Sequence, residues 1–263
     1  MKYFTTKMSL LPNEPPRPVV RELLRGIFEQ YRWFRPIGYG YASVREKIDP
    51  EHIDYDALLA YYDELRTIMV ASRAERDFII IAPARKDASP YGGYISWDAS
   101  PKAAAKAQWQ TAHLRQITEI MQLVDSPLAQ AGINEDLDRK KWRLVPNPDG
   151  FGQREVYTVR DYSEGLTGVF WRNFFGPPFV RMFGERLKDL PTGCTKEDLP
   201  GGIVLVQPYE DPSMAGTEEG IARERELIEH LGPECFYDHE RHIKPARFPE
   251  LPPSPTSFGM PGA

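Results

Sequence analysis

The residues best suited to chemistry lie near the C-terminus, where one cysteine and two histidines are closely spaced. Cys235, His239 and His242 follow a C-x3-H-x2-H pattern, with Asp238 between them. Thiolate and imidazole are common zinc ligands, so one interpretation is a metal site in a metal-assisted hydrolase. Zinc sites usually bring paired ligands, however, and the sequence has no second cluster to complete a tetrahedron. The favoured interpretation is a partly exposed surface cluster without metal.

Other candidate nucleophiles do not form a catalytic set. Cys194 lies in a polar loop (PTGC), but spacing alone places no histidine beside it. His113 lies within a predicted helix, where a packed or surface histidine is expected. The sequence contains neither the G-x-S-x-G elbow of serine hydrolases nor the G-x-x-x-x-G-K-[ST] loop that holds nucleotide phosphates. We therefore expect a protein that is not an enzyme and needs no cofactor.

One basic loop and two acidic stretches are candidates for binding. Arg85, Lys86 and Ser89 precede Gly92 and could hold an anion, although a solvated loop is the default expectation. Carboxylates could instead occupy the sites on a nuclease that hold nucleic acid, and would speed association by electrostatic steering. The acidic residues are Glu135, Asp136, Asp138, Glu218, Glu219, Glu224, Glu226 and Glu229. The alternative, which is favoured for each set, is a solvated helix face without a binding role, held by pairs such as Glu219 with Arg223.

Composition narrows the class of protein. The chain has 263 residues, a net charge of -5 and an isoelectric point near 5.7. A nucleic-acid binder would usually present a basic face, so direct binding to nucleic acid is disfavoured. Two cysteines do not make a disulfide framework, and no apolar run suits a signal peptide or a membrane span. These features predict a cytoplasmic protein.

The order of elements predicts an α+β fold, with helices packed on mixed or antiparallel sheets. The predicted helices cover residues 19–34, 54–69, 100–124, 178–188 and 218–231. The predicted strands cover residues 2–8, 37–44, 78–82, 142–145, 155–160, 166–171 and 201–209. Ser100 and Pro101 are expected to open the third helix, and residues 174–177 to form a tight passage. The charged stretch 135–141 is expected to be exposed.

A strong turn signal divides the chain into two similarly organised halves. The turn NPDGFG at 147–152 separates an N-terminal half, 1–146, from a C-terminal half, 153–243, packed against it as one compact unit. A proline-rich tail, 244–263, is expected to be extended or disordered. Residues 165–187 contain one tryptophan and five phenylalanines, and are expected to lie at the centre of the core.

Several glycine and aromatic motifs resemble a family of bacterial immunity proteins. The run Leu166-Thr-Gly-Val-Phe-Trp171, followed by Phe175-Gly176 and Phe183-Gly184, resembles the "GVxW … LG … GG" region of immunity proteins of polymorphic toxins and the type VI secretion system (T6SS). The passage Gly38-Tyr-Gly40-Tyr-Ala42 is similar to the "HGYAG" passage of immunity protein family 52, with Ile37 in place of the histidine.

This resemblance implies a function without catalysis. Members of such a family sit in the producer's cytoplasm and neutralise a cognate toxin, often one with a restriction-endonuclease-like nuclease domain. The chain is therefore expected to bind a secreted nuclease toxin, with Glu135, Asp136, Asp138, Glu218 and Glu219 as possible toxin-facing residues. The motifs are structural positions, so they identify no contact residue. A structural or adaptor component of a secretion system is a further alternative.

Overall fold

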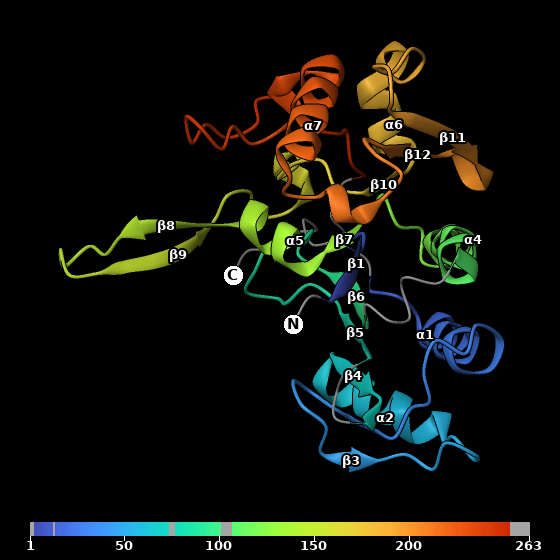
Figure 1. The fold of residues 1–263 in the computed structure, drawn as a ribbon. Helices are drawn as coiled ribbons and strands as arrows, with labels where there is room; N and C mark the ends of the chain where they lie inside the picture. Colours follow the sequence, from blue (N-terminus) through green and yellow to red (C-terminus); the bar gives the residue numbers. More distant parts are fainter. Residues whose placement is uncertain (1–2, 13, 74–76, 101–106, 253–263) are drawn as a thin grey trace, which may run out of the picture.

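A ten-stranded antiparallel sheet organises the part of the chain that the computed structural model describes, residues 3–12, 14–73, 77–100 and 107–252 (Figure 1). In spatial order the strands are β11 (Thr195–Leu199), β12 (Ile203–Gln207), β10 (Arg172–Phe175), β7 (Leu128–Ile133), β1 (Phe4–Ser9), β6 (Tyr94–Ala99), β5 (Phe78–Ala82), β4 (Ile68–Ala71), β2 (Gly38–Gly40) and β3 (Glu46–Lys47). Every pairing between neighbours is antiparallel.

Six α-helices and a separate hairpin complete the described structure. The helices are α1 (Arg17–Arg25), α2 (Tyr55–Leu65), α4 (Ala107–Leu123), α5 (Asn134–Lys141), α6 (Pro177–Phe183) and α7 (Glu218–Leu231). Strands β8 (Trp142–Pro146) and β9 (Gln153–Tyr157) form the hairpin, which projects from the body of the molecule (Figure 1). The predicted α+β class is confirmed.

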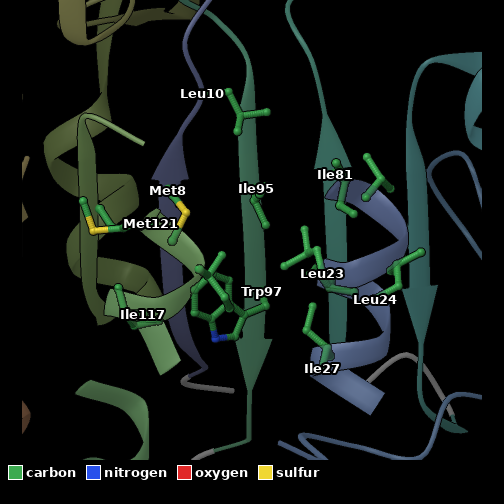
Figure 2. Close-up of a cluster of buried hydrophobic side chains, with 14 of the residues drawn as sticks. Met8, Leu10, Leu23, Leu24, Ile27, Ile81, Ile95, Trp97, Ile117 and Met121 are labelled. Carbon is green, nitrogen blue, oxygen red and sulfur yellow. The ribbon is translucent and has the colours of Figure 1, made fainter. Parts of the chain in front are cut away.

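Two large hydrophobic clusters lie on opposite faces of the sheet. In the first, α1 and α4 contribute side chains such as Leu23 and Ile117, which pack over strands β1, β5 and β6 (Figure 2). In the second, α6 and α7 contribute Phe179 and Leu227, which pack over β10 and β12. Phe174 belongs to the first cluster and its neighbour Phe175 to the second, and successive strand residues point to opposite faces. Each fully buried aliphatic or aromatic side chain contributes roughly 1.5–3 kcal/mol.

Burial along the strands shows where the sheet is covered on one face only. In β10 every residue is buried, and in β12 only Gln207 is not, because helices lie on both faces there. In β5 and β6 the pattern alternates instead: Ile79 and Ile81 are fully buried, whereas Phe78 and Ile80 are only partly buried. The helices therefore leave one face of β5 and β6 partly open.

The aromatic segment is central to the core, as expected, but its strand was predicted too early. Residues 166–171 run as an irregular segment, and β10 begins at Arg172, in the region predicted to be a tight passage. Gly165, directly before this segment, has a φ angle of 105°, which a strand does not adopt. The Asn173 side chain also bonds the backbone N–H and C=O of Phe170 and closes a turn there.

Three other predictions concern the start of α4, the boundary at 147–152 and the C-terminal tail. The proposed opening of α4 at Ser100 and Pro101 involves residues 101–106, which lie outside the described part. The boundary at 147–152 falls on the turn of the β8–β9 hairpin, and the strands before and after it join one sheet because β7 pairs with β10. Residues 244–252 form neither helix nor strand, and Arg247 Nη2 holds this segment to the body by donating to the Met182 carbonyl at 2.6 Å.

Candidate functional site

The acidic stretch of α5 is only partly on the surface. Glu135 and Asp138 are exposed, but Asp136 retains 5% of its accessible surface and Lys140 6%. The prediction that 135–141 is exposed throughout is therefore wrong for these two residues. Asn134 Nδ2 donates to Asp138 Oδ2 at 2.9 Å, so this surface carboxylate already has a partner in its own helix.

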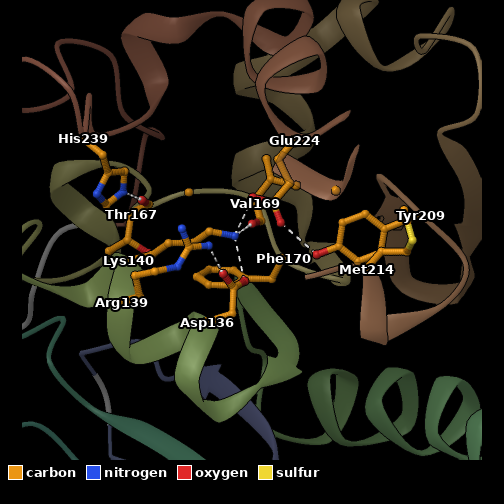
Figure 3. A network of polar contacts seen from close by, with 12 residues as sticks. Asp136, Arg139, Lys140, Thr167, Val169, Phe170, Tyr209, Met214, Glu224 and His239 are labelled. Atoms are coloured by element: carbon orange, nitrogen blue, oxygen red, sulfur yellow. Dashed lines mark hydrogen bonds and ion pairs between the residues drawn. The ribbon is translucent and has the colours of Figure 1, made fainter. Parts of the chain in front are cut away.

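Lys140 is the centre of a buried polar network that explains this difference (Figure 3). Its Nζ lies 2.7 Å from Asp136 Oδ2 and 2.8 Å from Glu224 Oε2, and it donates to the Val169 carbonyl at 2.6 Å. The hydroxyl of Tyr209 donates to Glu224 Oε1 at 2.8 Å. Burial raises the pKa of Glu224, and the positive charge of Lys140 opposes that rise.

The role of this network is to stabilise the fold. It joins α5, α7 and the irregular segment before β10, and two carboxylates share one ammonium at the centre, with Arg139 bonding Asp136 from the side. A buried charge is tolerated when it is paired and its remaining donors are satisfied. Asp136 therefore serves the fold and cannot face a partner, which corrects its place among the toxin-facing candidates.

The acidic residues at the start of α7 are exposed. The Thr217 hydroxyl accepts from the Gly220 amide at 3.0 Å and caps this helix, which begins at Glu218 as predicted. Glu218 and Glu219 follow in the first turn, where negative charge favours the helix dipole. Glu219 pairs with Arg223 at 2.7 Å, as expected for a solvated helix face.

The cysteine and two histidines do not form a metal site. Cys235 is fully buried in the second cluster, and burial raises the pKa of its thiol to about 11, with Glu234 adding to the rise. His239 donates from Nε2 to the Thr167 carbonyl at 2.7 Å, whereas His242 Nδ1 lies 3.3 Å from the Tyr237 hydroxyl. Among the described residues, no group of three or more His, Cys, Asp or Glu side chains is arranged to hold a metal ion.

His113 is packed in the core. A packed and a surface position were the two alternatives expected for this histidine. The Arg172 guanidinium can only donate, so His113 Nδ1 accepts from Nη1 at 3.0 Å and Nε2–H donates to Thr6 Oγ1 at 2.9 Å. Burial, followed by the positive charge of Arg172, lowers the pKa of His113 well below its ordinary value. This histidine is neutral and held in place, which suits a structural role.

A cavity of about 80 Å³ lies at the base of the hairpin, and no local sequence pattern predicted it. Lys7 of β1 and Lys141 of α5 line it, together with Gln130, Tyr157 and Thr167. Lys7 was assigned to a predicted strand, yet a lysine in the middle of a strand that is otherwise largely buried is itself a signal. The periodicity of the strand gives no information on what its lysine meets across the sheet.

Comparison with known proteins supports the fold. The chain is similar to the Pseudomonas aeruginosa T6SS protein PA0821, with a TM-score of 0.57 and 11% sequence identity, over 88% of this chain and 72% of that one. At this level of identity, the similarity shows a shared fold. No protein-family model and no curated protein matches the chain. None of the helices in the described part of the chain combines the length and apolarity that a membrane crossing requires.

Proposed function

We propose that this protein is an immunity protein that binds and neutralises a cognate secreted antibacterial toxin. The observation that carries the proposal is the fold similarity to a T6SS protein over 88% of the chain. The resemblance of residues 166–184 to immunity protein family 52 agrees with this setting. Inhibition by occlusion requires a stable scaffold and an interaction surface, and needs no catalytic group.

The positions of the family-like motif support a role in the scaffold. Trp171, Phe175 and Phe183 are all at least 98% buried, and an added Cβ at Gly168 would lie 3.1 Å from Cδ of the buried Lys140 side chain. Gly176 is similarly restricted, because its Cβ would approach the Pro127 carbonyl at 2.8 Å. These motif positions preserve the fold, so residues outside the motif contact the partner.

We further propose that the toxin is a nuclease and that exposed carboxylates contribute to binding it. Glu135 and Asp138 of α5 and Glu218 and Glu219 of α7 are on the surface. The buried network joins the two helices that carry these exposed carboxylates. Carboxylates there would approach the cationic groups with which a nuclease holds phosphates.

A co-expression experiment tests this function. The product of the adjacent gene is induced in a bacterial host with and without this protein, and growth is measured. We expect the neighbour to stop growth alone and this protein to restore it. Occlusion further requires that protection of a purified target follow a one-to-one titration, whereas protection by a small fraction of an equivalent would indicate turnover. A harmless neighbour, or growth arrest despite soluble expression of this protein, would contradict the proposal.

A further inference from the structure

The partly open sheet face lies beside the base of the hairpin. Lys7 of β1 pairs in register with Ser96 of β6, and Tyr94 of β6 pairs with Ala82 of β5. Residues 7, 82, 94 and 96 are each partly buried, whereas Met8, Ile81 and Ile95 on the opposite face are fully buried. The α-helices that pack on β1, β5 and β6 thus cover one face and leave the other accessible.

This open face carries positive charge and tyrosine. Lys7 Nζ lies 5.3 Å from the centroid of the Tyr94 ring, and Lys141 Nζ lies 5.5 Å from that of Tyr157. Arg85, in the loop that follows β5, donates to the hydroxyl of Tyr41. Tyrosine and arginine are enriched at the centres of protein interfaces, because they combine a large contact area with polar groups.

Three cations of this region, Lys7, Lys141 and Arg85, have no carboxylate partner at ion-pair distance in the described part of the chain. Within the described ranges, no Asp or Glu oxygen lies within 4.0 Å of the charged nitrogens of Lys7, Lys141 or Arg85. Asp161 also lines the cavity, but it accepts hydrogen bonds from Ser163 and Arg160. An unpaired, partly buried cation is costly, and an incoming anion would reduce that cost.

The burial of the two lysines agrees with this arrangement. Burial, together with the charge of Lys141, lowers the pKa of Lys7 to about 8, and the charge of Asp161 opposes both effects. Burial also lowers the pKa of Lys141, and Asp138 opposes that effect. The cavity between the lysines has a volume of about 80 Å³, enough for a carboxylate group, since one water occupies about 30 Å³.

We propose that the open face of β1, β5 and β6, with the cavity beneath the hairpin, is the docking site for an acidic, extended segment of the protein partner. This inference rests on the proposed function and names the chemistry of the segment that the partner presents. One carboxylate enters the cavity between Lys7 and Lys141, and further side chains lie over Tyr94. The chain as a whole has a net charge of -5, which disfavours a long polyanion such as nucleic acid but permits a short acidic segment.

Binding of an acidic peptide tests the site without any toxin. The probe is a fluorescein-labelled peptide of alternating glutamate and valine, and fluorescence anisotropy gives its Kd. We expect the double variant Lys7→Met/Lys141→Met to bind the peptide about tenfold or more weakly, because two charge-assisted contacts are lost. The matched control is Lys188→Met/Lys196→Met, which changes the net charge equally but removes lysines paired with Glu185 and Asp198. It should bind within about twofold of the wild type, since neither pair contacts the site.

Several outcomes would overturn this inference. Equal weakening of peptide binding in both double variants would show only nonspecific attraction. Thermal melts followed by circular dichroism confirm that each variant is folded before its binding is measured. Displacement of the peptide by inorganic phosphate as readily as by unlabelled peptide would assign the cavity to small oxyanions. Self-association that the Lys7→Met/Lys141→Met change abolishes would assign the face to a second copy of the chain.

The two proposals fail in distinguishable ways. If the peptide binds as expected but co-expression gives no protection, the docking site stands and the immunity function fails. If the protein protects the host and Lys7→Met/Lys141→Met protects equally well, the function stands and the docking site fails. The second measurement uses the same growth assay with the folded variant, so both results come from one set of strains.

Discussion

One buried lysine, Lys140, and one partly buried lysine, Lys7, show how differently this protein uses charge in two regions. Lys140 lies among carboxylates at the junction of α5 and α7, and each of its hydrogen bonds and ion pairs is with a carboxylate or carbonyl oxygen. Lys7 lies on the partly open sheet face, beside the Tyr94 ring, and the positive charge of Lys141 acts on it. The acidic region is rich in charge, but its buried charges neutralise one another. The sheet face carries fewer charges, and its cations have no carboxylate partner within ion-pair distance among the residues that the structure describes. Unpaired charge is thus a better guide to an interaction surface than charge density.

The largest expected effect comes from removing the lysine of the paired region. Lys140→Met leaves Asp136 and Glu224 buried side by side without their shared cation. We expect a loss of about 3–5 kcal/mol in the free energy of unfolding, measured by urea denaturation. Lys188→Met, which removes an exposed partner of Glu185, is the control and should leave the midpoint nearly unchanged. A loss below about 1 kcal/mol for Lys140→Met would mean that the network contributes no more to stability than an exposed ion pair does.

On the sheet face, the matching change is Lys7→Met, which should increase the free energy of unfolding instead of lowering it. The pKa of Lys7 is about 8 in the folded protein and about 10.5 when unfolded, so the unfolded state binds more protons between these values and stability rises with pH there. Lys7→Met removes this penalty. We expect the variant to be more stable than the wild type by about 1–3 kcal/mol at pH 7, with the difference shrinking towards pH 10.5. Urea denaturation at both pH values measures it, and a destabilised variant at pH 7 would contradict the assignment.

The exposed acidic side chains should affect association with a partner more than stability. Glu135→Lys/Asp138→Lys reverses two surface charges without touching the buried network. If these residues face the toxin, association should slow by about tenfold or less, and the difference from wild type should fade in high salt. Stopped-flow or surface plasmon resonance with the purified toxin measures this rate. An effect independent of salt would indicate a disturbed fold instead.

The smallest expected effect is at a paired surface carboxylate. Glu219→Ala removes the pair with Arg223 at the start of α7, where both side chains are substantially exposed. We expect the free energy of unfolding to change by about 0.5 kcal/mol or less. Thermal denaturation of the variant beside Thr217→Ala provides the scale, because loss of the helix cap costs about 1 kcal/mol. A larger loss for Glu219→Ala than for Thr217→Ala would reverse this ranking.

Local sequence patterns were sufficient for much of the secondary structure. The strand at 78–82 and the core of the strand at 201–209 were predicted from continuous apolar runs. Helix α2 begins where expected, because Asp54 accepts from the Ala57 amide at 3.0 Å and caps it. These features depend on residues within one or two turns of each other, so periodicity and capping residues are enough to identify them.

The candidate site depended on contacts between distant parts of the chain. Asp136 and Lys140 look like members of an exposed charged run, but Glu224 and the Val169 carbonyl, far along the chain, make their burial possible. The strand at 172–175 is likewise determined by its pairing with β7 and β12, which outweighs the local aromatic pattern before it.

Composition and spacing by themselves determined the α+β class, most of the helices and some of the strands, and they disfavoured a strongly basic binding surface. Only the tertiary structure decided which charges are neutralised, because an ion pair requires two groups that the chain brings together from far apart. It also decided that one face of β5 and β6 stays partly open. That outcome depends on which side of a continuous sheet each helix packs against, and no local pattern specifies it.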